Sequence, residues 1–359
     1  MTALVLFGSF AVLLIIGVPI ALALGAATML TLGFIDMPTA VVGQRIFTAL
    51  DSSGIMAIPF FVLAGNLMTK GGISRRIVDL ASAVVGGVRG GLFYVMIISC
   101  AFFAALSGSA PATVIAIGAM LYPEMVKRGY PDKRAAGLLA VSGGLGPIIP
   151  PSIIMVVYGT LTSSSIGDLF KGGLVAGSMI AVVLAVVCIV LSHTENWPRS
   201  DKRLSLSEFA VAFYKAFLAV MLPVIVLGGI YSGLLTPTES AAVAVMYAFV
   251  VGVFVYRELP LKNLMQVIVE SGRGSAMVMF IIATSTAFSW LFTYAGISQT
   301  LIDVINAMHL SAWAYCLIVA AVLLLFGTFL EGIATCVLLV PLLWPVAQSL
   351  GINVIHFGM

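Results

Sequence analysis

The sequence predicts an all-α membrane protein whose chain crosses the bilayer many times. Of its 359 residues, 61% are apolar and only 9% are charged, and the mean hydropathy is +1.18. A soluble domain has about 25% charged residues. Apolar runs of about 17–25 residues are long enough to span a bilayer, and runs near or above that length recur along the chain: 3–34, 54–69, 173–192, 211–232, 240–256, 276–294 and 312–330.

An internal repeat indicates how the chain is organised. Residues 72–79, Gly-Ile-Ser-Arg-Arg-Ile-Val-Asp, return 224 positions later as residues 296–303, Gly-Ile-Ser-Gln-Thr-Leu-Ile-Asp, and Gly129 returns 222 positions later as Gly351. The basic residues do not return: Lys70, Arg75, Arg76, Lys127, Arg128, Lys133 and Arg134 align with Tyr294, Gln299, Thr300, Ser349, Leu350, Ile355 and His356. Because Lys and Arg concentrate in cytoplasmic loops, the two copies are expected to face opposite ways across the bilayer. Inverted repeats of this kind are typical of secondary transporters.

We therefore divide the chain into a first inverted repeat (1–192), a cytoplasmic linker (193–210) and a second inverted repeat (211–359). The linker is placed in the cytoplasm by its basic residues Arg199, Lys202 and Arg203. Residues 3–34 are too long for one straight crossing at 1.5 Å per residue, which favours two short helices over one kinked helix. Residues 258–274 are predicted to form an amphipathic helix along the membrane surface, before a crossing at 276–294.

The first motif that could carry chemistry lies in a predicted re-entrant hairpin at about 92–126. Its expected tip, residues 107–113, reads Ser-Gly-Ser-Ala-Pro-Ala-Thr, a composition that breaks helices. Irregular backbone survives at membrane depth only where it is buried in protein or lines a wet cavity. Its carbonyl and hydroxyl oxygens suit a hard cation. The alternative is a helix kink packed by small residues.

The second motif is a predicted broken helix at about 134–160. Residues 142–152, Ser-Gly-Gly-Leu-Gly-Pro-Ile-Ile-Pro-Pro-Ser, hold three glycines and three prolines within an apolar span, so a continuous helix is excluded. Half-helix N-termini attract anions, and C-terminal carbonyls attract cations. A plain loop between two short helices is the alternative, but it would upset the even number of crossings between the basic loops.

The third motif is the repeat partner of the first, a predicted hairpin at about 312–349. Its tip contains Gly327, Thr328, Glu331 and Thr335, and Glu331 aligns with Ser109. A lone acid inside an apolar run is costly and usually marks an ion or proton path. The alternative is a protonated structural carboxyl group that bonds across helices. Elsewhere, Thr236-Pro237-Thr238-Glu239 predicts a capping box at a helix N-terminus.

These patterns resemble the large membrane subunit of the tripartite ATP-independent periplasmic (TRAP) transporters over essentially the whole chain. The ordered motifs that carry the resemblance are Ile58-Pro59-Phe60-Phe61 with Leu63-Ala64-Gly65, Gly71-Gly72-Ile73, Ser107-Gly108-Ser109-Ala110, Gly146-Pro147-Ile148-Ile149-Pro150-Pro151-Ser152 with Tyr158-Gly159, and Thr236-Pro237-Thr238-Glu239-Ser240. The resemblance implies an elevator-type secondary transporter of the bacterial inner membrane, not an enzyme. Sodium would drive uptake of an organic acid (a C4-dicarboxylate, keto acid or sialic acid) that a periplasmic solute-binding protein delivers. A small membrane subunit is the implied partner, and no cofactor besides Na⁺ is implied.

The resemblance also implies where the ions and the substrate bind. The first sodium site would involve Ser107, Gly108, Ser109, Gly144, Gly146 and Pro150, and the second Gly327, Thr328, Glu331 and Thr335. Substrate contacts are expected from Ser109, Ala110, Thr113, Pro151 and Ser152, with the substrate between the two hairpin tips. In the family the second copy continues to its own broken helix, whereas this sequence stops at Met359. We therefore expect the chain to be a fragment lacking several tens of residues.

Other function classes stay open or are disfavoured. An ion channel can also use carbonyl-lined re-entrant loops, and a sodium/carboxylate symporter could work without a binding protein. An intramembrane serine protease would need a His or Lys base at membrane depth beside Ser107 or Ser109, and none lies in a matching span. There is no GxxxxGK[ST] phosphate-binding loop for ATP. The net charge of +3 comes from loops and does not indicate nucleic-acid binding.

Overall fold

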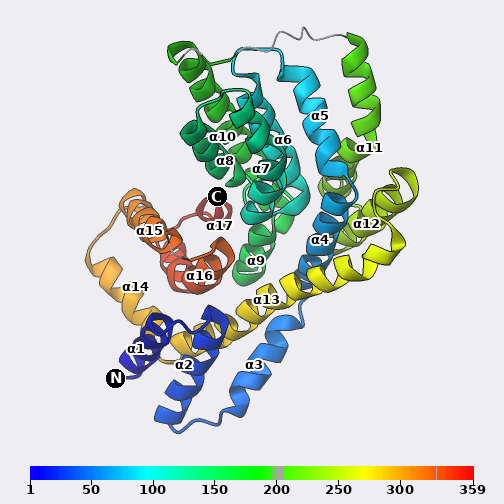
Figure 1. Cartoon of the computed structure of the whole chain (residues 1–359). Helices are drawn as coiled ribbons and strands as arrows, with labels where there is room; N and C mark the ends of the chain where they lie inside the picture. The colour runs from blue at the N-terminus through cyan, green and yellow to red at the C-terminus, as the bar shows by residue number, and fades with distance from the viewer. Residues whose placement is uncertain (196, 199–205, 329) are drawn as a thin grey trace. The chain divides into compact units, whose positions relative to one another are not determined.

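The computed structural model describes residues 1–195, 197, 198, 206–328 and 330–359. This described part is all-α, which confirms the predicted fold class, and six of its helices are long and apolar enough to cross a membrane. In chain order the helices (Figure 1) are α1 (Thr2–Ile15), α2 (Ile20–Phe34), α3 (Ala40–Leu50), α4 (Ser53–Lys70), α5 (Ile73–Val85), α6 (Gly91–Ser107), α7 (Ala110–Lys127), α8 (Asp132–Gly143), α9 (Ile153–Thr162), α10 (Ile166–Thr194), α11 (Leu206–Tyr231), α12 (Pro237–Val250), the π-helix η1 (Val251–Val255), α13 (Leu261–Tyr294), α14 (Ile297–Ala307), α15 (Ala312–Gly327), α16 (Gly332–Ser349) and α17 (Val354–Gly358).

Two compact units can be distinguished, and each takes segments from both predicted repeats. Unit 1 consists of Met1–Met56, Val156–Ile166 and Arg273–Gly358, and unit 2 consists mainly of Ala57–Met155 and Gly167–Gly272. A division by spatial contact does not follow the boundaries of a sequence repeat, so the repeat boundaries stay a prediction.

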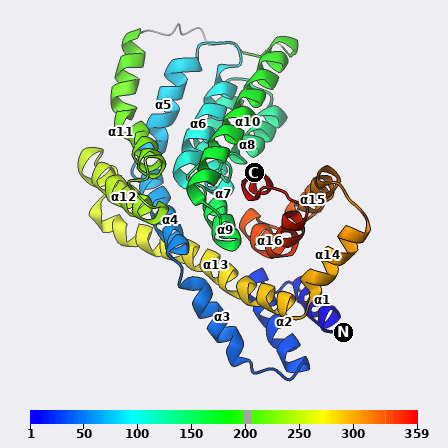
Figure 2. The same cartoon turned by 180° about the vertical axis from the view of Figure 1, so that it is seen from behind.

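Residues 3–34 form two helices, α1 and α2, as the length argument favours. Gly17 takes a left-handed conformation with φ of +84°, and Pro19 is the residue that precedes α2. A left-handed residue ends a helix at little cost when it is glycine. Proline lacks the N–H that a continuous helix would need at that point. The two helices pack side by side within unit 1 (Figures 1 and 2).

The prediction of a separate surface helix at 258–274 is wrong. Residues 261–294 form one continuous helix, α13, of 34 residues. Gly272 and Gly274 lie within this stretch, but glycine lowers helix stability by only about 1 kcal/mol, and no proline interrupts it. The polar first half and the apolar second half of this stretch therefore belong to a single helix.

The core of unit 2 forms where α5, α6, α7 and α10 meet. Phe93, Met96 and Cys100 of α6 are fully buried, together with Ile117 and Met125 of α7. The same group of helices is seen from both sides in Figures 1 and 2. In contrast, much of α10 exposes apolar side chains, as a helix that faces lipid does. These exposed residues include Val175, Met179, Val182, Val183, Val186 and Val190.

The core of unit 1 brings α1 and α2 against the second half of α13 and against α16. Phe7 meets Phe288 and Phe292 edge to face, with ring centroids 5.8 and 5.7 Å apart. Edge-to-face pairs add about 0.5–1.5 kcal/mol beyond the area they bury. A smaller cluster joins Tyr315 and Val319 of α15 to Val346 and Ala347 of α16.

Two pairs of turns have the same backbone conformation at positions that the repeat makes equivalent. Gly72 and Gly296 both have positive φ (+77° and +71°), and each directly precedes a helix, α5 or α14. Gly129 and Gly351 likewise have φ of +78° and +71° after α7 and α16. The left-handed region favours glycine, so retention of glycine in both copies has a direct structural reason.

The start of the predicted linker is anchored on unit 2. Trp197 is buried and lies against Phe93, with ring centroids 4.1 Å apart. The backbone N–H of Gly90 donates to the carbonyl oxygen of Pro198 (3.0 Å). The Glu195 carboxylate accepts hydrogen bonds from Arg134 (2.6 Å) and from the Trp197 indole (3.0 Å). The predicted linker residues 196 and 199–205 lie outside the described residues.

The Glu195 contacts predict a pH dependence. The hydrogen bond from Arg134, aided by that from Trp197, lowers the pKa of Glu195 below its usual value. A carboxyl group with a lowered native pKa stabilises the fold at pH values above its unfolded pKa, and this contribution is lost as the pH falls through the native pKa. We therefore expect Glu195→Gln to lower the melting temperature of the detergent-solubilised protein at pH 7, with a difference from wild type that shrinks below about pH 4. If the melting temperatures of the variant and the wild type differed by the same amount at pH 7 and below about pH 4, the Glu195 carboxylate would not stabilise the fold through its charge.

Candidate functional site

The first predicted hairpin contains a break of two residues between α6 and α7. Gly108 ends α6 in the left-handed conformation, with φ of +59°, and Ser109 is extended. The expected tip at 107–113 is therefore too long, because Ala110–Thr113 already belong to the first turn of α7. Pro111 stands at the start of that helix, where its fixed φ suits a helix and its missing N–H costs nothing.

Hydroxyl groups and a carbonyl group cluster at this break. The Thr113 hydroxyl donates to the Ser109 carbonyl oxygen (2.8 Å) and lies 3.1 Å from the Ser107 hydroxyl. The Ser109 backbone N–H donates weakly to Ser107 Oγ (3.4 Å). Thr113 is fully buried and Ser107 is 7% exposed. The site at this tip is built from neutral oxygen atoms on α6 and α7.

The loop between α8 and α9 approaches this tip with its backbone. A Cβ atom on Gly146 would lie 2.6 Å from the carbonyl carbon of Ser109 and 2.8 Å from the nitrogen of Ala110. A Cβ atom on Gly108 would lie 2.8 Å from the Pro151 carbonyl oxygen. Real Cβ atoms do not approach backbone atoms this closely, so only glycine allows these two contacts. The two motifs that the sequence separates by more than 30 residues are therefore in direct contact within unit 2.

Four helix ends meet at this contact. The C-terminal ends of α6 and α8 carry partial negative charge, and the N-terminal ends of α7 and α9 carry partial positive charge. The Ile153 backbone nitrogen would lie 3.1 Å from a Cβ on Gly108, which places the start of α9 beside the end of α6. Such an arrangement can attract a cation to its carbonyl groups and an anion to its N–H groups.

Two serines complete the polar groups of the broken helix. The Ser152 hydroxyl donates to the Pro147 carbonyl oxygen (2.5 Å) and accepts from the Met155 N–H (3.4 Å), so it caps α9. Ser142, at the end of α8, is fully buried, and its hydroxyl has no hydrogen-bond partner among the described residues. Because buried hydroxyl groups nearly always form a hydrogen bond, the Ser142 hydroxyl is a candidate to bind a ligand. Sequence reasoning did not single out Ser142 as a ligand, although it begins the glycine–proline segment.

The structure brings together most, but not all, of the residues predicted for the first site. Gly108 and Ser109 lie against the Gly146 and Pro151 segments, with Ser107, Ala110, Thr113 and Ser152 adjoining them. Gly144 does not contact the hairpin tip in the same way. Among the described residues, the one heavy atom within 4 Å of a Cβ on Gly144 is the Val141 carbonyl oxygen of α8 (3.1 Å). Pro150 is buried and is joined to Pro151 by a cis peptide bond.

The second predicted hairpin is formed by α15 and α16 in unit 1, and its break includes Thr328 and Glu331. Glu331 is extended, precedes α16, and makes no side-chain capping bond. The Thr335 hydroxyl donates to the Glu331 carbonyl oxygen (3.0 Å), as Thr113 does to Ser109 at the equivalent positions of the first copy. The Glu331 side chain is exposed, and Gly327 and Thr328 are exposed beside it.

Sequence reasoning missed a contribution from α4 to the first tip. A Cβ on Gly65 would lie 3.4 Å from Cα of Ser107, so α4 passes close to the end of α6. The signal was present, because Gly65 belongs to the Leu-Ala-Gly motif in an apolar run.

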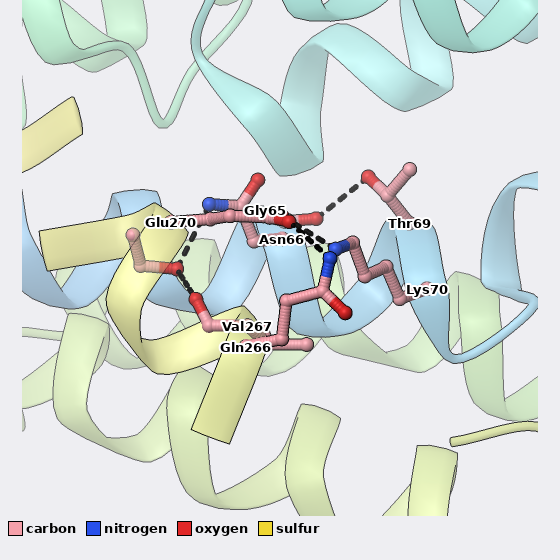
Figure 3. A network of polar contacts seen from close by, with 8 residues as sticks. Gly65, Asn66, Thr69, Lys70, Gln266, Val267 and Glu270 are labelled. Carbon is pink, nitrogen blue, oxygen red and sulfur yellow. Dashed lines mark hydrogen bonds and ion pairs between the residues drawn. The ribbon is translucent and has the colours of Figure 1, made fainter. Parts of the chain in front are cut away.

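A polar network holds this part of α4 against α13 (Figure 3). The Asn66 amide donates to the Ser271 hydroxyl (2.8 Å), and Lys70 forms an ion pair with Glu270. Gln266 also donates to Glu270 (2.8 Å). The helix that touches the hairpin tip is thus fixed through contacts about 200 residues apart in sequence.

Comparison with known proteins identifies the family of this chain. Residues 7–359 match the family described as "Tripartite ATP-independent periplasmic transporter, DctM component". The chain is 42% identical to the C4-dicarboxylate TRAP transporter large permease protein DctM of Rhodobacter capsulatus, an alignment that covers 100% of this chain and 85% of that protein.

Two further relatives carry other substrates in their names. The isethionate TRAP transporter permease protein DctMQ of Oleidesulfovibrio alaskensis is 41% identical over 99% of this chain and 56% of its own length. The 2,3-diketo-L-gulonate TRAP transporter large permease protein YiaN of Escherichia coli is 38% identical over 96% of this chain and 81% of its own length.

Proposed function

Because this chain belongs to the DctM component family of the tripartite ATP-independent periplasmic transporters, we propose that it is the permease of a sodium-coupled uptake system for an organic acid. The observation that carries the proposal is the meeting of four helix ends at the neutral tip formed by Gly108 and Ser109. The substrates that the relatives are named for, a C4-dicarboxylate, isethionate and a diketogulonate, are all anions. This supports an organic acid as the substrate here.

The proposed binding positions of sodium and of the substrate follow from the chemistry of the helix ends. Sodium is a hard cation that binds oxygen ligands, and the carbonyl ends of α6 and α8, with the hydroxyls of Ser107 and Ser142, offer such ligands. The substrate carboxylate would be bound by the N-terminal ends of α7 and α9. Bound sodium would offset the negative charge of the substrate in a site that has no cationic side chain at its tip. Binding of the two would therefore be coupled.

In this proposal transport follows an elevator mechanism in the bacterial inner membrane. A periplasmic solute-binding protein would deliver the substrate, and a small membrane subunit would accompany the permease. The family description supports these partners, and the motion is proposed because the site lies within a group of packed helices that could move together.

The sodium requirement is tested by uptake into proteoliposomes. The chain would be reconstituted with its membrane partner and binding protein, and initial rates of labelled C4-dicarboxylate uptake would be measured with an inward gradient of Na⁺ or of K⁺. We expect uptake to be at least about tenfold faster with Na⁺, a difference of about 1.4 kcal/mol, and to collapse when a sodium ionophore is added. Equal uptake with both cations would overturn sodium coupling, and unsaturable flux would instead favour a channel.

A further inference from the structure

A hollow of about 610 Å³ opens between α5, α11 and the segment that follows η1, all within unit 2. α5 and α11 pack side by side there (Figures 1 and 2). The charged and aromatic residues that line the hollow include Arg75, Arg76, Asp79, Lys215, Tyr256 and Glu258. None of these residues belongs to the hairpin or to the broken helix.

One wall of the hollow is rigid because Arg76 is held on three sides. Its guanidinium group pairs with Glu258 (2.7 Å) and lies over the Tyr256 ring, 3.6 Å from the centroid. It also donates to the Gly72 carbonyl oxygen (2.9 Å). The Tyr256 hydroxyl in turn donates to the Lys215 carbonyl oxygen (3.0 Å). The positive charge of Arg76 is therefore largely compensated by groups of the protein itself.

Two other cations remain available to a ligand. Arg75 and Lys215 are both exposed, and neither forms an ion pair with any described residue. The carboxylates that face the hollow are Glu258, which pairs with Arg76, and the exposed Asp79. The unpaired charge at the opening is thus net positive, which favours an anionic ligand.

The basic hollow continues into an apolar groove on α11. The groove holds about 370 Å³ and is lined by Phe209, Phe213 and Phe217, with Tyr214 and Phe217 shared by both hollows. The phenylalanine rings follow one another at 6.0 and 6.1 Å along the helix and are 38–45% exposed. A ligand that fits both parts has an anionic head and an apolar body.

We propose that this hollow binds an anionic phospholipid of the cytoplasmic leaflet, with its phosphate between Arg75 and Lys215 and its acyl chains against α11. The loop-charge pattern places Arg75 and Arg76 on the cytoplasmic side, where anionic lipids attract basic residues near the membrane surface. Basic pockets between membrane helices on that side are suited to phospholipid head groups. The site is separate from the proposed sodium site and does not depend on sodium coupling.

Native mass spectrometry of the detergent-solubilised chain tests this inference. The protein would be titrated with dioleoyl-phosphatidylglycerol and with dioleoyl-phosphatidylcholine, which share their acyl chains, and with inorganic phosphate as a competitor. We expect preferential retention of phosphatidylglycerol and about a fivefold weaker binding for each of Arg75→Gln and Lys215→Gln, the contribution of one basic residue near an anionic surface. The control is Lys262→Gln, an exposed lysine near the start of α13 that does not line the hollow, and it should leave binding unchanged.

Each alternative result overturns the inference in a distinct way. Equal retention of the two lipids would show that charge does not select the ligand. An equal loss in Lys262→Gln would show a diffuse surface attraction instead of a site. Displacement of the lipid by millimolar phosphate would assign the hollow to a free phosphate compound. Because Arg75 and Lys215 are exposed and unpaired, the variants should retain the wild-type melting temperature, which separates loss of binding from loss of folding.

Discussion

Replacing Gly146 by alanine is expected to lower sodium-dependent uptake by about tenfold or more. The new methyl group would lie 2.6–2.8 Å from the backbone of Ser109 and Ala110, so the loop between α8 and α9 must move away from the hairpin tip. Overpacking of a tight contact costs about 1–3 kcal/mol, and 1.4 kcal/mol changes an equilibrium constant tenfold. The measurement is the initial uptake rate in proteoliposomes as a function of Na⁺ concentration.

Gly137→Ala provides the matched control for this prediction. Gly137 lies in α8, is exposed, and has no heavy atom within 4 Å of the position that a Cβ would take. Alanine in a helix interior is more stable than glycine by about 0.5–1 kcal/mol, so this variant should insert and transport at least as well as wild type. If Gly146→Ala retained wild-type uptake while remaining inserted, the contact between the loop and the hairpin tip would have no part in transport.

The helix breaks at the candidate site could be predicted from sequence because they depend on local chemistry. Gly108 can take the left-handed conformation that ends a helix, whereas Pro111 and the prolines after Gly146 fix φ and lack an N–H, and the helices end or begin beside these residues. The capping box at Thr236 is confirmed for the same reason: the Thr236 hydroxyl accepts from the Glu239 backbone N–H, and the Glu239 carboxylate accepts from the Thr236 backbone N–H. Residues whose effect on the backbone is intrinsic can be interpreted without a structure.

Contacts between distant segments could not be predicted in this way. Asn66 is an ordinary polar residue in an apolar run until α13 brings Ser271 to it, 205 residues later. Gly65 belongs to a recognisable motif, but its partner becomes known only when Ser107 is placed against it. The surface helix expected at 258–274 failed for a related reason, because the change from polar to apolar composition after residue 274 does not itself end a helix.

Glu331→Gln is expected to raise the Na⁺ concentration that gives half-maximal uptake by about tenfold or more. Glu331 is the only acid in the tip of the second hairpin as far as that tip is described, and its exposed side chain makes no capping bond to α16. Its backbone carbonyl already satisfies Thr335, so the carboxylate itself is free to serve as a charged ligand. Glutamine keeps the size and the oxygen atom but removes the charge, and hydrogen bonds or ligand contacts with a charged group are worth about 1.5–3 kcal/mol.

Glu239→Gln is the control that separates loss of charge from loss of the ion site. Glu239 also stands at the start of a helix, and glutamine can replace glutamate in a capping box, so this variant should keep wild-type sodium activation. If Glu331→Gln behaved like Glu239→Gln, the carboxylate would not be an ion ligand. A lower melting temperature in Glu331→Ala with unchanged sodium activation in Glu331→Gln would then assign it the structural role that bonds across helices. A selective rise in the sodium requirement of Glu331→Gln, with its melting temperature unchanged, is the result that the second ion site demands.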